Sequence, residues 1–172
     1  ICKGDSVLFS ATGASTYSWT PATGLSCTTC ANPTAKPTSN TTYIVTGTDT
    51  SSCANKDTVT VTVNPLPVVN AGADKSICAG YSDTLHATGA ATYVWTPGTS
   101  LSCTSCANPV VTPTGTLTYT VTGTDANGCK NKDSVQVRAN PSPTVSGGPD
   151  QSVCKGGSVT LNATGASIYT WS

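Results

Sequence analysis

Residues 58–63 read Thr-Val-Thr-Val-Thr-Val, a strict alternation of polar and apolar side chains. A period of two places the valines on one face of a β-strand and the threonines on the other. Residues 42–46 and 117–121 repeat the pattern, with tyrosine and valine expected to face inward. β-Branched residues suit a half-buried pleated surface. Because no segment shows a period of 3.6, we predict an all-β fold.

The alternating stretches belong to a repeat of 76 residues. Residues 1–4, Ile-Cys-Lys-Gly, recur as Ile-Cys-Ala-Gly at 77–80 and as Val-Cys-Lys-Gly at 153–156. Residues 1–76 and 77–152, aligned without gaps, share 44 identical positions. A unit of this length is the size of a small domain, so we expect beads with separate cores rather than turns of a solenoid.

Two proline-rich stretches, residues 64–67 and 140–143, are typical of stiff linkers and divide the chain. The division predicts a first domain at 1–64 that lacks its first strand, a complete second domain at 65–140, and the start of a third at 141–172. We therefore expect the chain to be a stretch of a longer protein.

Core positions recur with the repeat. The aligned residues Phe9, Leu85 and Leu161 are large and apolar, and each copy has one Tyr-x-Trp element. The tryptophans of these elements are Trp19, Trp95 and Trp171. Six or seven short strands with a core tryptophan on an early strand indicate an immunoglobulin-like β-sandwich, here arranged in tandem as beads on a rod.

The repeat resembles a known family through three stretches. These are the Ile-Cys-x-Gly start at residues 1–4, Leu-Ser-Cys-Thr-Thr-Cys-Ala-Asn-Pro at 25–33, and Thr-Tyr-Ile-Val-Thr-Gly-Thr-Asp at 42–49. In this order they resemble the PKD-like and Ig-like repeats of giant surface proteins from gliding bacteria that use type IX secretion. The resemblance covers the whole chain. It implies an extracellular, cell-surface shaft or adhesin, and such repeats also serve as spacers in secreted enzymes.

The resemblance also implies candidate O-glycosylation sites. The rule it suggests is Asp, then Ser or Thr, then an apolar residue or Thr, and it selects Ser6, Thr58, Thr84 and Ser134. In the expected strand phasing each hydroxyl faces outward, as a bulky glycan requires. Asp followed by Ser or Thr is also ordinary turn chemistry at the entrance to a strand, and both readings remain open.

Nine cysteines in a chain rich in Thr, Ser and Gly indicate an oxidising compartment. We predict local disulfides between Cys27 and Cys30 and between Cys103 and Cys106. A redox-active pair would need a helix N-terminus, and none is expected here. A structural zinc site would need two further ligands, and the single histidine, His86, occurs in one copy only.

The remaining cysteines are Cys2, Cys53, Cys78, Cys129 and Cys154, and they allow two arrangements. Cys2 with Cys53 would close a loop within one domain. In an Ig-like sandwich, however, these two turns lie at opposite poles, and Cα atoms must approach within about 7 Å to be bridged. The alternative is a staple between neighbouring domains, Cys2 with Cys129. In that arrangement Cys78 pairs beyond Ser172 and Cys53 pairs before Ile1. Both arrangements remain open.

Composition and motifs favour a non-catalytic role. Only 9% of residues are charged and the net charge is zero, so no basic patch for nucleic acid is expected. No long apolar stretch predicts a membrane span. We find no nucleophile–base set, phosphate-binding loop or metal-ligand cluster, and we expect no enzyme activity, cofactor or metal.

The sequence thus predicts a structural repeat of a long extracellular filament or adhesin shaft, rigidified by disulfides. Its expected partners are other copies of the repeat, together with surface glycans or other cells. The alternative is a carbohydrate-binding or spacer module of a secreted multidomain enzyme.

Overall fold

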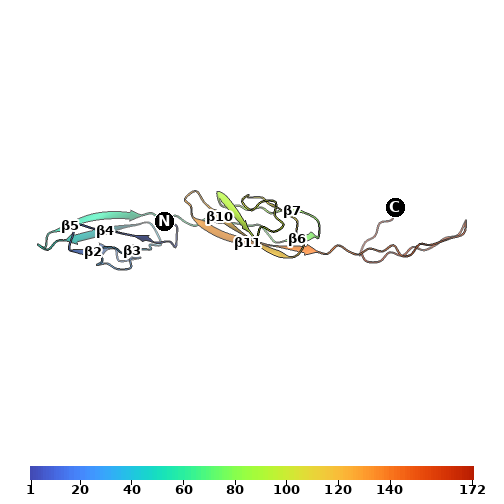
Figure 1. The fold of residues 1–172 in the computed structure, drawn as a ribbon, viewed down its shortest axis with the longest axis horizontal. Helices are drawn as coiled ribbons and strands as arrows, with labels where there is room; N and C mark the ends of the chain where they lie inside the picture. Colours follow the sequence, from blue (N-terminus) through green and yellow to red (C-terminus); the bar gives the residue numbers. More distant parts are fainter.

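A computed structural model describes all 172 residues, and every regular element in it is a strand. We call residues 1–64 the first domain, 65–140 the second domain and 141–172 the third segment. The two domains lie end to end, and the third segment trails from the second (Figure 1). No helix of the structure is long and apolar enough to cross a membrane.

The first domain contains five strands. They are β1 (Val7–Leu8), β2 (Thr16–Thr20), β3 (Thr34–Ala35), β4 (Thr41–Thr48) and β5 (Ala54–Val61). Strands β2, β4 and β5 form one antiparallel sheet, and β1 pairs with β3 in a second layer. The long β4–β5 ladder runs from Thr41 opposite Val61 to Thr48 opposite Ala54.

The second domain contains six strands. They are β6 (Lys75–Cys78), β7 (Asp83–Thr84), β8 (Thr92–Thr96), β9 (Val110–Val111), β10 (Leu117–Thr124) and β11 (Lys130–Asn140). One sheet has the order β6-β11-β10-β8, and β7 pairs with β9 opposite it. Strand β6 runs parallel to the end of β11, whereas the other ladders are antiparallel.

Each domain has its own hydrophobic core between its two layers. The first core holds Phe9, Trp19 and Tyr43, whose rings contact one another at centroid distances of 5.2 and 5.4 Å from Phe9. Offset aromatic contacts of this kind stabilise a core beyond their buried area. The second core is larger and holds twelve buried residues, against five in the first.

The larger second core has a simple cause. Residues 65–74 run along the open side of the second sandwich and insert Val69 and Ala71, which are 8% and 2% exposed. The first domain has no such segment in the structure, and its core is correspondingly smaller.

The third segment contains no strand, only an isolated antiparallel bridge between Ser146 and Thr164. Trp171 is 56% exposed, although its repeat equivalent, Trp95, is 1% exposed. The apolar residues of this segment therefore lack the opposing layer that buries them in the second domain.

The alternation of the sequence reappears in the burial of the strands. In β10, Tyr119 and Val121 are buried while Thr118 is exposed, and in β5 Val61 is buried between exposed threonines. The chain is an all-β protein of immunoglobulin-like β-sandwich domains in tandem, as the sequence predicted.

Candidate functional site: the interdomain disulfide joint

The two domains are joined by a disulfide between Cys2 and Cys129. The two Cα atoms lie 5.4 Å apart, within the ordinary range for a disulfide. Of the two arrangements that the sequence left open, the structure contains the one between domains, and Cys2 does not pair with Cys53.

A tight turn holds Cys129 in place on the second domain. The Asp125 Oδ1 atom accepts hydrogen bonds from the backbone N–H groups of Asn127 (2.8 Å) and Cys129 (2.9 Å). The N–H of Asp125 donates to the carbonyl of Cys129 at 2.9 Å. Gly128 occupies the left-handed region at φ +81°, which glycine adopts without steric cost. This turn fixes Cys129, which is fully buried.

Cys2 lies in a second preformed turn. The Asp5 N–H donates to the Cys2 carbonyl at 2.9 Å, and Gly4 has a positive φ of 99°. Cys2 also forms a parallel bridge with Asn64, and the Lys3 N–H donates to the Asn64 carbonyl at 2.8 Å. The disulfide therefore leaves the first domain beside Asn64, where the chain itself crosses to the second domain.

The second domain receives both connections close together. The Asn131 Nδ2 atom donates to the carbonyl of Pro67 at 2.9 Å, which attaches the incoming chain two residues from Cys129. A single linker permits rotation about several axes. Two adjacent covalent connections allow fewer relative orientations of the domains than one linker does, because both connections must be satisfied by the same orientation.

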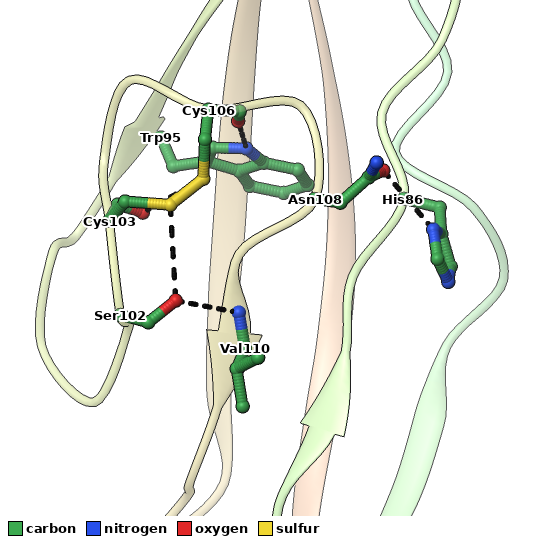
Figure 2. The surroundings of a disulfide bond; sticks show 7 residues. All are labelled: His86, Trp95, Ser102, Cys103, Cys106, Asn108 and Val110. Carbon is green, nitrogen blue, oxygen red and sulfur yellow. Dashed lines mark hydrogen bonds between the residues drawn. A yellow bond between two sulfur atoms is a disulfide. The ribbon is translucent and has the colours of Figure 1, made fainter.

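The short Cys-x-x-Cys loops form the other disulfides, Cys27 with Cys30 and Cys103 with Cys106. Figure 2 shows the second of these loops folded over the edge of Trp95. The Trp95 indole Nε1–H donates to the Cys106 carbonyl at 3.0 Å, and Trp19 makes the same bond to Cys30 at 2.9 Å. Because a buried indole N–H is costly without a partner, each loop also satisfies its core tryptophan.

Three cysteines are free and exposed in the structure: Cys53, Cys78 and Cys154. Cys53 is the repeat equivalent of Cys129, and Cys78 and Cys154 are the equivalents of Cys2. Each of the three free thiols therefore occupies the repeat position of one cysteine of the Cys2–Cys129 disulfide.

The candidate glycosylation residues lie on the surface to different degrees. Ser6, Thr58 and Ser134 are exposed, and Thr84 is half-buried. The Asp57 Oδ1 atom accepts the N–H of Thr58 at 2.7 Å, a local bond that also matches the turn-chemistry reading.

His86 is exposed, and its Nδ1 lies 3.1 Å from the Asn108 Oδ1 atom (Figure 2). No group of three or more His, Cys, Asp or Glu side chains is arranged to hold a metal ion. The structure contains one ion pair, in which the Lys75 Nζ atom lies 2.6 Å from Asp83. The Asp83 carboxylate accepts hydrogen bonds from the Lys75 side chain and from the Thr84 N–H, and these two bonds lower the pKa of Asp83 below its usual value.

Sequence reasoning missed the role of residues that attach the chain at the joint. Asn131 and Asp133 hold residues 65–74, since Asp133 Oδ2 accepts the Ala71 N–H at 2.8 Å. The sequence carried a signal for this, because Asn55 and Asp57 occupy the same positions in the first copy. The segment 64–67, expected only as a linker, instead leads directly into a segment that packs on the second domain.

No family model matches the chain. No curated protein matches it.

Several solved structures resemble it weakly. A C-terminal fragment of intimin, in complex with the intimin-binding domain of its translocated receptor, is 17% identical with a TM-score of 0.43. The match covers 76% of this chain and 53% of that one. The eight N-terminal Ig domains of Down syndrome cell adhesion molecule are 13% identical with a TM-score of 0.40. The match covers 83% of this chain and 26% of that one. The fibronectin(III)-like modules of Clostridium thermocellum CbhA are 14% identical with a TM-score of 0.37. The match covers 81% of this chain and 88% of that one. The chain spans about half or less of the length of the protocadherin and of the Down syndrome cell adhesion molecule that it matches.

Proposed function

We propose that this chain is a structural, non-catalytic segment of a long extracellular filament or adhesin shaft on a cell surface. The observation that carries the proposal is the disulfide between Cys2 and Cys129, which adds a second covalent connection between neighbouring domains. A module whose task was only to tether another domain would not need a stiff joint.

The end-to-end arrangement of the two domains supports the same role. The domains lie end to end along one axis (Figure 1), so each repeat adds length. Threonines are exposed on β4 and β5, as in the hydrogen-bonded pair Thr42 and Thr60 (2.9 Å between hydroxyls). Only 9% of the residues of the chain are charged. A polar surface with few charges limits non-specific association, and attached glycans would extend this effect.

The disulfides are consistent with an extracellular location, since thiols stay reduced in the cytosol. The partners that we propose are other copies of the repeat, because the two domains of this chain are themselves copies that join end to end through Cys2 and Cys129. Cell-surface attachment and export by a type IX route belong to the same proposal through the resemblance of the repeat.

The proposal is tested by immunogold electron microscopy of the cells that make this protein, with antibodies against residues 1–172. We expect gold along thin surface fibres that become more flexible after treatment with a reductant. Gold confined to compact secreted particles, or fibres whose bending is the same before and after reduction, would contradict the proposal.

A further inference from the structure

The outer face of the main sheet of the second domain gathers positive charge. Alternate residues of β10 and β11, such as Tyr119 and Val135, are buried and point into the core, so the residues between them point outward. We call this outward set the basic face. It consists of Thr118, Thr120, Thr122 and Thr124 on β10 and Lys130, Lys132, Ser134, Gln136 and Arg138 on β11.

No carboxylate lies on the basic face. Asp133 is the one acidic residue in the four strands of the sheet, and it alternates with the outward set. Asp133 and Asp74, which precedes β6, each accept a backbone N–H at 2.8 Å. The single ion pair of the structure, Lys75 with Asp83, includes none of the three cations of the face. These cations therefore remain available to an external anion.

The three cations follow the length of β11, which runs along the rod (Figure 1). Lys130 and Lys132 are neighbours on one side of the strand, about 6.7 Å apart along it, and Arg138 lies about 20 Å beyond them. Thr124 and Thr122 of β10 stand opposite the two lysines in the ladder. The face is thus a track of cations with a row of hydroxyl groups beside it.

The basic face stays open where domains join. Lys130 follows the joint cysteine Cys129 and is exposed with the first domain attached. Arg138 lies near the opposite pole of the second domain, and its repeat equivalent is Thr62. Thr62 is exposed beside the complete joint between the two domains. Joining domains in tandem therefore leaves the face accessible.

The charge belongs to the second copy and not to the repeat as such. The corresponding residues of the first domain are Ala54, Lys56 and Thr62. The two domains thus share one fold and an outer face with hydroxyl groups, and they differ by two positive charges on that face. This difference supplies a comparison within the same chain.

The chemistry of the basic face fits a linear anionic polysaccharide. Lysine and arginine bind carboxylate or sulfate groups through charge-assisted hydrogen bonds, and threonine and serine hydroxyls both donate to and accept from sugar hydroxyls. The aromatic residues of the sheet, Tyr93, Trp95 and Tyr119, are buried in the core. Stacking on neutral sugar rings is therefore not how this face would bind, and the charge of the polymer is required.

Other anionic macromolecules fit less well. Three cations on a chain of zero net charge fall short of the basic surface that nucleic-acid-binding domains present. A membrane surface would need apolar side chains to insert between the lipids, and Val94 is the one exposed large apolar residue on this side of the sheet.

Each contact by itself is weak, because exposed ion pairs contribute little and are screened by salt. A polymer with many anionic groups offers many overlapping sites and can contact several chains at once, so its apparent affinity exceeds that of one site. Binding of this kind is reversible and sensitive to ionic strength.

We infer that the basic face of the second domain binds a linear anionic polysaccharide, which lies along β11. The inference rests on the proposed role as an extracellular shaft. It gives that shaft a ligand along its side, in addition to contacts with other copies of the repeat.

The test measures binding of residues 1–172, with disulfides formed, to immobilised polygalacturonate and dextran sulfate by biolayer interferometry. The chain is prepared without glycans, since Ser134 lies on the basic face. We expect reversible binding to one or both polymers and none to uncharged dextran. Binding should disappear at about 1 M salt, where the screening length is about 3 Å. The triple variant Lys130→Gln, Lys132→Gln, Arg138→Gln should bind about tenfold more weakly.

The matched control is Lys3→Gln, Lys36→Gln, Lys56→Gln, which removes three exposed charges from the first domain and gives the same net charge. We expect it to bind like the wild type. Conversely, Ala54→Lys with Thr62→Arg builds the second-domain set around Lys56 and should strengthen binding to the long polymers. Circular dichroism checks that each variant folds.

The inference is overturned if the chain binds neither polymer, or if the two triple variants lose affinity equally, since net charge alone would then account for binding. Equal binding of duplex DNA or of phosphatidylglycerol vesicles, lost in the same variant, would also overturn the assignment to polysaccharide. None of these results affects the filament proposal, which electron microscopy of the cells tests separately. Polysaccharide binding by a chain that forms no surface fibres would refute the filament and keep the binding face.

Discussion

At the scale of single residues, the two copies of the repeat have different residues at two backbone positions in the left-handed region. The turn before the joint cysteine has Gly128 in the second domain and Ser52 in the first, with φ of 81° and 66°. The turn after the Pro of the Tyr-x-Trp element has the reverse, with Gly24 at 77° and Ser100 at 63°. Each domain therefore carries one strained serine where the other has glycine.

We expect Ser52→Gly to stabilise the first domain by roughly 0.5–1 kcal/mol. A non-glycine residue in the left-handed region costs about 1–2 kcal/mol, and part of that gain is offset by the greater freedom of glycine in the unfolded chain. Urea unfolding followed by tryptophan fluorescence measures the change. Gly128→Ser is the reciprocal variant and should destabilise the second domain by a similar amount. If both variants had the same free energy of unfolding as the wild type, the argument from backbone strain would be wrong.

Two buried tyrosines make stability depend on alkaline pH. Tyr119 is fully buried, and its hydroxyl donates to the Thr99 carbonyl at 2.9 Å. Burial raises the pKa of Tyr119, and of Tyr43 in the first domain, above the usual value of 10. Above pH 10 the tyrosine of the unfolded chain ionises while the folded one stays neutral, and this difference favours unfolding.

We therefore expect the free energy of unfolding to be constant below pH 10 in this respect and to fall as the pH rises through 10 toward the raised pKa. Tyr119→Phe should lose about 1 kcal/mol at neutral pH, for the hydrogen bond, and show a smaller alkaline fall. Tyr81→Phe is the control because Tyr81 is 68% exposed. Urea unfolding at pH 7 and pH 11 gives both quantities, and an alkaline fall unchanged in Tyr119→Phe would refute the assignment.

At the scale of elements, the sequence predicted the strands from chemistry that is local. In β5 and β10 the alternation of Thr with Val or Tyr specifies both the strand and its inward face, and the structure has these residues at the expected depth. The parallel pairing of β6 with β11 was not predictable, because a four-residue strand carries no mark of its partner. The packing of residues 65–74 depends on Asn131 and Asp133, more than fifty residues away, and proline content alone indicated only a linker.

The sequence reduced the partner of Cys2 to two candidates, Cys53 and Cys129, but did not decide between them. The argument from opposite poles counted against a Cys2–Cys53 disulfide but did not exclude it, because it depends on the path of every strand between Cys2 and Cys53. Only the three-dimensional arrangement places Cys129 beside Cys2.

Breaking the disulfide of a Cys-x-x-Cys loop should change both the stability of its domain and the fluorescence of its core tryptophan. Replacing Cys103 and Cys106 by serine frees a loop that holds the carbonyl bound by Trp95. Closing a four-residue loop contributes about 2 kcal/mol in the chain-entropy account, so we expect the second domain to lose up to about that amount. The emission of Trp95 should shift toward longer wavelength as water reaches the indole.

Cys27→Ser with Cys30→Ser provides the matched change in the first domain, where Trp19 makes the equivalent bond. Each pair of substitutions should affect only its own domain. Loss of stability in both domains from either pair would show that the loops act through the joint rather than on their own tryptophan.

At the scale of the whole molecule, the interdomain disulfide determines how the chain bears tension. Cys2 and Cys129 are 127 residues apart in sequence, so their bond lets a pull at the two ends bypass almost everything between them. Tension then passes from the first residues through the disulfide into β11 and the third segment. The first domain and most of the second are shielded, even though they make up most of the length of the folded rod (Figure 1).

Stretching single molecules between their termini with optical tweezers measures this shielding. The extensible path of the oxidised chain is only its first two residues and residues 129–172, which gives a fully stretched length of about 150 Å at 3.3–3.6 Å per residue. Cys2→Ser with Cys129→Ser opens the path to nearly all 172 residues, since only the two short Cys-x-x-Cys loops stay closed, or about 580 Å on the same scale. Cys27→Ser with Cys30→Ser is the control, since that loop lies inside the shielded region and should leave the oxidised length at about 150 Å. An oxidised chain that extends as far as the Cys2/Cys129 double variant would mean that the Cys2–Cys129 disulfide does not carry the load.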